Sequence, residues 1–393
     1  MTPRVALVTH STRPRGGMVH SLSLAEALVE LGVDVTLVTL GQPGGGLHRP
    51  TGAPYVVLDA PERADTLEER VDRSVDALTA GLSSLAGRFD LFHTQDCIAA
   101  RAAARVRDGG AGIPVLRTVH HVDDFTTAKL VDCQRQAILE PDRVLVVSRH
   151  WQGLLRGDYG VKAEVVHNGV DAARFAAEPP AGVVEGLRRR IGAGDRFVLL
   201  AVGGIEPRKG SVHLLAALGE LVAEHGGGGR GPVLAVVGGQ SFQDYTAYRD
   251  AALASLPGLG LELGRDVVLV GTVDDDELRA WYHAADALAF PSLKEGWGLA
   301  VLEAMAAGLP VVATDIPVFR EYLEPGRDAL LVPPGEPGPL AAAMAELMSD
   351  ESLRRRLSAA GRLVAARYPW EECARRHLDV YQALVAIGRR AVG

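Results

Sequence analysis

Cysteine is scarce in this chain, which has three in 393 residues, at Cys97, Cys133 and Cys373. An odd number at wide spacing argues against a disulfide framework and against the paired ligands of a zinc site, and favours a reducing cytoplasm. Long hydrophobic runs are missing as well, so no segment predicts a membrane-spanning helix. The short apolar stretch at the N-terminus predicts a strand rather than a signal peptide.

Basic blocks and basic stripes rich in aromatics are also absent, and the net charge is −8. Nucleic acid is therefore not an expected partner. The predicted helix 62–76 carries six carboxylates against three arginines. A face that is acidic on balance is not drawn to anionic lipids, so we expect membrane association to be weak or absent.

What the chain does contain is a globular composition, with 47% hydrophobic and 23% charged residues, long enough for two or three domains. Short, nearly continuous apolar runs alternate with longer helical patterns, which is typical of parallel strands covered on both faces. The first series of strands is predicted at 4–10, 33–40, 54–60, 89–96, 114–121 and 143–148.

A second series follows a break at 176–195, where two adjacent prolines and a basic cluster predict a linker. We therefore predict an α/β protein of two Rossmann-like doubly wound domains, 1–180 and 181–369, with helix 370–393 packing back on the first. Ligands in such sheets bind beyond the carboxyl ends of the strands, here in a cleft between the domains. The second strands are predicted at 196–204, 232–239, 266–273, 287–293, 310–315 and 329–334.

Two glutamates stand out in SLKEGWGLAVLEAMAAG, residues 292–308. Glu295 follows a predicted strand on a glycine-rich loop, and Glu303 falls on the second turn of a helix that begins near Gly298. The N-terminus of a helix presents unpaired N–H groups suited to a phosphate. This spacing is common by chance, but here it lies between a strand, glycines and a helix. The context predicts an anion site between two carboxylates that accept hydrogen bonds from hydroxyl groups, as a nucleotide sugar requires.

Residues 291–315 resemble the E-x7-E segment of the family 4 retaining glycosyltransferases, which have the GT-B fold. The resemblance implies transfer of a hexosyl unit from a nucleoside-diphosphate sugar, most often a UDP-sugar, to a small-molecule or glycan acceptor. It also implies a front-face mechanism without a cofactor or catalytic metal. Four other segments resemble the family in the same order: 15–28, 118–125, 165–175 and 203–218.

The resemblance implies that Arg208 and Lys209 neutralise the leaving diphosphate, Arg208 through planar contacts and Lys209 as a point charge. Many members carry an arginine directly after the glycine that ends this strand. This chain has Gly204 there and Glu206 nearby, so Arg208 is the candidate to supply that charge.

By the same resemblance, Glu295 binds the donor sugar, Glu303 binds the ribose, and Trp297 either packs or contacts the donor. His120 faces the sugar near the reacting carbon, with His121 as the alternative because neighbours on a strand point to opposite faces. The implied catalytic residues are His120, Glu295, Arg208 and Lys209. The implied donor-binding residues are Gly16, Gly17, Arg208, Lys209, Glu295, Gly296, Trp297, Gly298, Leu299 and Glu303.

Other polar residues receive structural interpretations. His20 is predicted on a helix surface or at the cleft edge. The acidic run 274–276 precedes a helical pattern and is predicted to cap it rather than to bind a metal. The histidines and aspartates of 120–124 lack a second ligand set, so no metal is predicted there either.

Three rival functions stay open to different degrees. A nucleotide-sugar epimerase on the same fold needs a set of carboxylates and histidines around the sugar that the sequence does not show in order. An NAD-dependent oxidoreductase is disfavoured because HSTRPRGG is not GxGxxG and no acidic residue closes the second strand. A non-catalytic protein that binds sugar nucleotides is disfavoured by the intact glutamate and Arg-Lys pairs.

Overall fold

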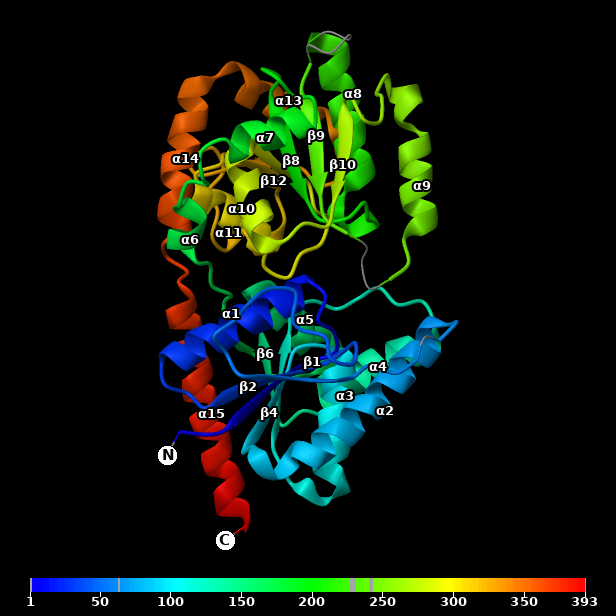
Figure 1. Ribbon diagram of the computed structural model, residues 1–393, viewed down its shortest axis with the longest axis vertical. Coiled ribbons are helices and arrows are strands. Elements are labelled where there is room, and N and C mark those ends of the chain that lie inside the picture. The colour runs from blue at the N-terminus through cyan, green and yellow to red at the C-terminus, as the bar shows by residue number, and fades with distance from the viewer. Residues whose placement is uncertain (1, 63, 226–230, 240–242, 393) are drawn as a thin grey trace. The chain divides into compact units, whose positions relative to one another are not determined.

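The computed structural model describes residues 2–62, 64–225, 231–239 and 243–392 (Figure 1). The chain divides into two compact units, Met1–Gly169 with Trp370–Gly393, and Val170–Pro369. Each unit is built around one parallel sheet with helices on both faces, which confirms the predicted pair of doubly wound domains. Among the described residues, no helix combines the length and the apolar character that a membrane crossing requires.

The first unit holds a seven-stranded sheet in the order β3-β2-β1-β4-β5-β6-β7. Strand β1 is buried along its whole length, with Val5 opposite Val35 on one side and Leu91 on the other. The loops after β1, β4 and β5 therefore leave the sheet from adjacent strands at the same edge. The strands are β1 Val5–Thr9, β2 Val35–Gly41, β3 Tyr55–Asp59, β4 Leu91–Thr94, β5 Val115–Val119, β6 Arg143–Val146 and β7 Glu164–Val165.

The C-terminal helix α15 (Trp370–Val392) completes this unit. Its Ala374, Tyr381 and Leu384 share a hydrophobic core with Leu22 and Leu28, which lie on the buried face of α1. A helix from the far end of the sequence thus covers the sheet beside α1. The other helices of the unit are α1 Gly16–Glu30, α2 Leu67–Leu85, α3 Cys97–Val106, α4 Ala128–Leu139 and α5 Arg149–Tyr159.

The second unit holds a six-stranded sheet in the order β10-β9-β8-β11-β12-β13. The neighbours β8 and β11 are followed by the loops that carry residues 207–210 and 291–298, so the topology brings these loops together. The strands are β8 Val198–Val202, β9 Val233–Val237, β10 Val267–Gly271, β11 Ala287–Phe290, β12 Val311–Thr314 and β13 Leu330–Val332.

Nine helices lie in the described part of the second unit. Helices α8 and α13 bury Leu214, Leu218 and Met344 in one core with Leu199 and Leu234 of the sheet. The helices are α6 Ala172–Ala176, α7 Val183–Arg190, α8 Ser211–His225, α9 Thr246–Ala254, α10 Asp275–Ala284, α11 Leu299–Ala307, α12 Pro317–Arg320, α13 Pro337–Ser349 and α14 Glu351–Ala365.

The predicted linker at 176–195 is wrong, and the units divide earlier, after Gly169. Residues 183–190 form α7, whose Leu187 is buried. The basic cluster is part of the fold because Arg188 donates hydrogen bonds to the carbonyl oxygens of Ala284 and Arg196, at 2.9 and 2.7 Å. The sequence resembled a solvated linker because its arginines are charged, although Arg188 donates hydrogen bonds to backbone carbonyl groups inside the unit.

Candidate active site

The loop after β8 presents two cations. Residues Pro207–Lys209 form a single 3₁₀ turn, which ends at Gly210 in the left-handed conformation, with φ +65°. A Cβ at Gly210 would lie 2.1 Å from the carbonyl oxygen of Pro291, so a glycine is needed for the two loops to touch. This contact places Arg208 and Lys209 beside Glu295.

Glu295 Oε1 accepts hydrogen bonds from both cations, and lies 2.7 Å from Lys209 Nζ and 3.4 Å from Arg208 Nη1. Its side chain is 9% exposed, so burial alone would raise its pKa. Attraction by Lys209 and Arg208 outweighs burial and lowers the pKa of Glu295 to about 2. Burial also lowers the pKa of Lys209, and Glu295 opposes that shift. The structure therefore brings together three residues that the sequence predicted as one site.

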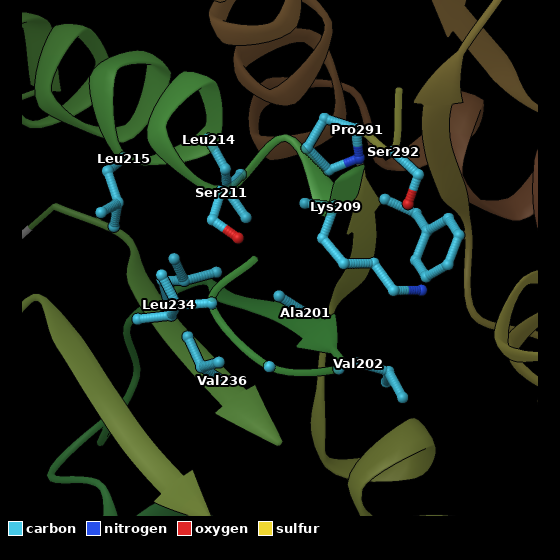
Figure 2. Close-up of a pocket in the computed structure, with 15 residues that line it drawn as sticks. Ala201, Val202, Lys209, Ser211, Leu214, Leu215, Leu234, Val236, Pro291 and Ser292 are labelled. Carbon is cyan, nitrogen blue, oxygen red and sulfur yellow. The ribbon is translucent and has the colours of Figure 1, made fainter. Parts of the chain in front are cut away.

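Behind this loop lies a small cavity of about 30 Å³, room for about one water molecule. It is lined mostly by apolar residues of the second-unit core, among them Ala201, Leu214 and Leu234. Figure 2 shows the Lys209 side chain among the residues that line this cavity, and its Nζ lies 4.5 Å from the centre of the Phe290 ring. Lys209 and Ser292 also line this cavity, so it adjoins the candidate site.

Gly204, the position where the family resemblance led us to look for an arginine, has little room for a side chain. A Cβ at Gly204 would lie 2.4 Å from the carbonyl oxygen of Gly239 and 3.2 Å from Glu206 Oε1. Glu206 is buried, and its Oε2 lies 3.4 Å from Arg208 Nε. Arg208 therefore lies between two carboxylates, Glu206 and Glu295.

The segment around Gly298 has the predicted form. Gly298 has φ +85° and precedes α11, which begins at Leu299. A Cβ at Gly298 would lie 2.6 Å from Phe319 Cε1, so this helix start also depends on glycine. The first-turn N–H groups of α11 lie directly after the loop of Glu295, which suits an anion. Glu303 falls on the second turn, as the sequence predicted.

Glu303 has a different environment from Glu295. Its Oε2 accepts a hydrogen bond of 2.7 Å from the hydroxyl of Tyr282, a buried residue of α10. Burial raises the pKa of Glu303 to about 7, and the Tyr282 hydrogen bond opposes the shift. Sequence analysis missed Tyr282, and no local signal could find it, because its partner is 21 positions away.

Trp297 is a packing residue, 2% exposed. Its ring lies 4.8 Å from that of Tyr322 and 5.4 Å from that of Tyr368, centre to centre. Of the two roles that the sequence left open for Trp297, packing is the one its side chain has in this arrangement. Only its backbone remains a candidate for binding, because the indole completes an aromatic cluster in the core.

His120 and His121 lie just beyond β5, which ends at Val119. His120 Nε2 lies 3.0 Å from Gln95 Oε1, whereas His121 Nε2 lies 3.4 Å from an Asp123 oxygen. The two rings have different partners, but both residues lie beyond the strand that was predicted to include them, so strand alternation does not apply to them. Burial lowers the pKa of His120 to about 3, so the ring is neutral near pH 7.

The two glycines that begin α1, Gly16 and Gly17, differ in what surrounds them. A Cβ at Gly17 would meet His120 Cδ2 at 4.0 Å, whereas one at Gly16 would meet nothing within 4 Å.

The prediction for His20 is wrong, because its side chain is fully buried. Its ring lies edge-on to His120 at 4.7 Å and to Trp370 of α15 at 5.4 Å. Helix α15 covers this face of α1. The sequence predicted that helix 370–393 packs on the first domain, but not that it buries His20.

The acidic run 274–276 caps α10, as predicted. Asp274 accepts a hydrogen bond of 2.8 Å from the backbone N–H of Glu277, and Asp275 lies 3.5 Å from Arg174. Across the described ranges, no group of three or more His, Cys, Asp or Glu side chains is placed to hold a metal ion.

Comparison with known proteins identifies the family. The profile of "Glycosyltransferase Family 4" matches residues 14–174, and that of "Glycosyl transferases group 1" matches residues 184–364. The D-inositol 3-phosphate glycosyltransferase of Thermobispora bispora is 30% identical over 98% of this chain and 96% of its own length. The protein of the same name from Xylanimonas cellulosilytica is 30% identical over 96% of each chain.

Two solved structures have the same fold. Sucrose-phosphate synthase from Thermosynechococcus elongatus superposes with a TM-score of 0.79 at 23% identity, covering 98% of this chain and 100% of that one. Anabaena HepE, solved with UDP and glucose, gives 0.78 at 19% identity, covering 97% and 100%. The resemblance seen in the sequence is confirmed: this chain belongs to the family 4 glycosyltransferases and has the GT-B fold.

Proposed function

We propose that this glycosyltransferase moves a hexosyl unit from a UDP-sugar to a small-molecule or glycan acceptor, with retention of anomeric configuration and without a catalytic metal or cofactor. The observation that carries the proposal is the cation pair Arg208 and Lys209, held on Glu295 beside the start of α11. Fixed cations and helix N–H groups form a site for a departing diphosphate.

In the proposed reaction, the bond from the anomeric carbon to the diphosphate oxygen breaks as the acceptor oxygen bonds to the same face. The acceptor's proton passes to the departing phosphate oxygen. Arg208 and Lys209 stabilise the negative charge that develops on the diphosphate. Glu295 accepts from the sugar hydroxyls, Glu303 accepts from the ribose, and His120 contacts the sugar.

The choice of substrates to test follows the comparisons. Anabaena HepE is described in complexes with UDP and with UDP-glucose, and the Thermobispora relative is named for D-inositol 3-phosphate. UDP-glucose is therefore the first donor to test and D-inositol 3-phosphate the first acceptor. With donor alone, an epimerase would convert the sugar, and a non-catalytic binder would leave it intact even when acceptors are added.

Replacing the cations tests the proposal. We expect Lys209→Ala and Arg208→Ala each to lower kcat by about 10²- to 10³-fold, because each removes a charge that stabilises the leaving group. Release of UDP from the best donor–acceptor pair measures the effect, and Tm checks folding. Arg249→Ala, which removes an arginine paired with Asp250 on α9, is the control and keeps wild-type kcat. Near-normal turnover in either active-site variant would contradict the proposal.

A further inference from the structure

A chain of hydrogen bonds links helix α15 to His120. The Tyr381 hydroxyl lies 2.8 Å from His93 Nδ1, and His93 Nε2 lies 3.0 Å from Gln95 Nε2. Gln95 Oε1 then lies 3.0 Å from His120 Nε2. The residues come from α15, β4, the loop after β4 and the loop after β5. One continuous path therefore joins four separate segments of the first unit.

The interior of this path is closed to solvent. Tyr381 and His93 are 0% exposed and Gln95 is 3% exposed, whereas His120 is only partly buried. Thr118 supports the path from β5, with its hydroxyl 2.8 Å from His93 Nε2. Buried polar groups keep their partners because losing one leaves a desolvated group unpaired. Only the His120 end can meet a ligand.

The orientation of the Gln95 amide favours one direction for these hydrogen bonds. Its nitrogen faces His93 Nε2, which favours the His93 tautomer with the proton on Nδ1, facing the Tyr381 oxygen. Its oxygen faces His120 Nε2, which favours the His120 tautomer with the proton on Nε2. In that tautomer His120 Nδ1 is the unprotonated nitrogen.

We propose that Gln95 is a positioning residue that holds His120 in the Nε2-protonated tautomer, so that Nδ1 presents an acceptor to a hydroxyl of the donor sugar. The inference rests on the role proposed above for His120. It gives the C-terminal helix a part in the site, because Tyr381 aligns His93 and His93 aligns the amide. A sugar with a hydroxyl at this position fits, and one with a carboxylate there does not.

Several titratable groups surround His120. They are His20 on α1, Arg117 and His121 on the β5 segment, Asp96 beside Gln95, and His377 on α15. After burial, the repulsion by His121 and Arg117 lowers the pKa of His120 further, and Asp96 opposes the shift. A neutral ring can accept at Nδ1, whereas a protonated ring cannot.

Nuclear magnetic resonance of protein labelled with ¹⁵N-histidine tests the tautomer directly. The wild-type His120 signal, assigned by its loss in His120→Ala, is expected to show the proton on Nε2. In Gln95→Leu we expect a mixture of tautomers and kcat lowered by about tenfold, the effect of one neutral hydrogen bond. UDP affinity should not change, because Arg208, Lys209 and Glu303 lie in the other unit.

A matched control and a second variant separate positioning from folding. Gln152→Leu removes a glutamine that donates a 2.8 Å hydrogen bond to the Ala163 carbonyl oxygen, and keeps wild-type kcat. Gln95→Glu gives His120 a carboxylate partner, which raises its pKa. The fall in kcat at acid pH should then begin at a higher pH than in the wild type, a change that a purely structural residue would not cause.

The outcomes distinguish this inference from the proposed function. Full activity in His120→Ala would overturn the role of His120 and, with it, the inference. An inactive His120→Ala beside a Gln95→Leu with wild-type kcat and an unchanged tautomer would overturn the inference and leave the proposed function standing. A wild-type His120 with its proton on Nδ1 would also overturn it.

Discussion

At the scale of residues, the two glutamates of the E-x7-E segment carry opposite pKa shifts. Two neighbouring cations keep Glu295 ionised, with a pKa of about 2, whereas burial raises the pKa of Glu303 to about 7. The spacing is visible in the sequence, but the environments are not. The same residue type therefore serves as a permanent carboxylate at one position and as a titrating group at the other.

Glu303 should make nucleotide binding pH-dependent. An ionised carboxylate accepts from ribose hydroxyls better than a protonated one, so affinity for UDP should rise as the pH passes through about 7. The ionisation of UDP itself also contributes to the pH dependence and is subtracted first. Glu303→Gln should abolish the increase in UDP affinity that remains. Calorimetry at pH 6, 7 and 8 measures both proteins. Equal pH dependence in the two would exclude Glu303 from ribose binding.

The same group affects folding with a defined sign. Because its pKa is raised above the ordinary value of 4.5, folded Glu303 keeps its proton where the unfolded chain has lost it. Its contribution to the free energy of unfolding is therefore present below pH 4.5 and is lost as the pH rises to about 7. Glu303→Gln should show a flatter stability profile over this range.

Local sequence could predict Arg208, Lys209, Glu295 and Glu303, because each lies in a short segment between a strand and a helix. It could not predict residues whose partners are remote. His93 and Tyr381 are 288 positions apart, and Gln95 and His120 are 25 apart. Such pairs depend on the order of strands in the sheet and on where α15 packs, and neither leaves a local pattern.

At the scale of elements, the contact between two loops positions the cations. The loop after β8 touches the loop after β11 through Gly210 and Pro291. Sequence periodicity found the strands on either side because their apolar runs are continuous. It misassigned α7, because the adjacent prolines and the arginine cluster of residues 176–195 resemble a linker.

Gly210→Ala should disrupt this contact. The alanine would need φ near +65° and a Cβ 2.1 Å from the Pro291 oxygen. We expect Gly210→Ala to lower the free energy of unfolding by about 1–3 kcal/mol more than a change that introduces backbone strain alone. It should also lower kcat, because Lys209 moves away from Glu295.

Gly192→Ala is the matched control for that experiment. Gly192 has φ +62°, and a Cβ there would meet nothing within 4 Å. Gly192→Ala therefore isolates the cost of holding alanine in a left-handed backbone conformation, about 1–2 kcal/mol. Urea unfolding of both variants gives the difference. Equal destabilisation would show that the Gly210 contact does not hold the two loops together.

At the scale of the whole molecule, the fold and the return of helix 370–393 to the first unit could be predicted, but the first boundary was placed at 180 instead of Gly169. Two series of apolar strands predicted two doubly wound sheets. The boundary at Gly169 escaped prediction because Val170 and Tyr368 run side by side, joined by a hydrogen bond of 2.8 Å between their backbones. Proximity between residues so far apart in sequence leaves no mark in composition.

The central claim is that Arg208 and Lys209 bind the diphosphate of a sugar nucleotide beside the start of α11. A crystal structure of the protein with UDP tests it most directly. The account predicts phosphate oxygens within hydrogen-bond distance of Arg208, Lys209 and the first N–H groups of α11, with ribose hydroxyls on Glu303. UDP bound with its phosphates away from residues 208–209 and 298–303 would contradict it.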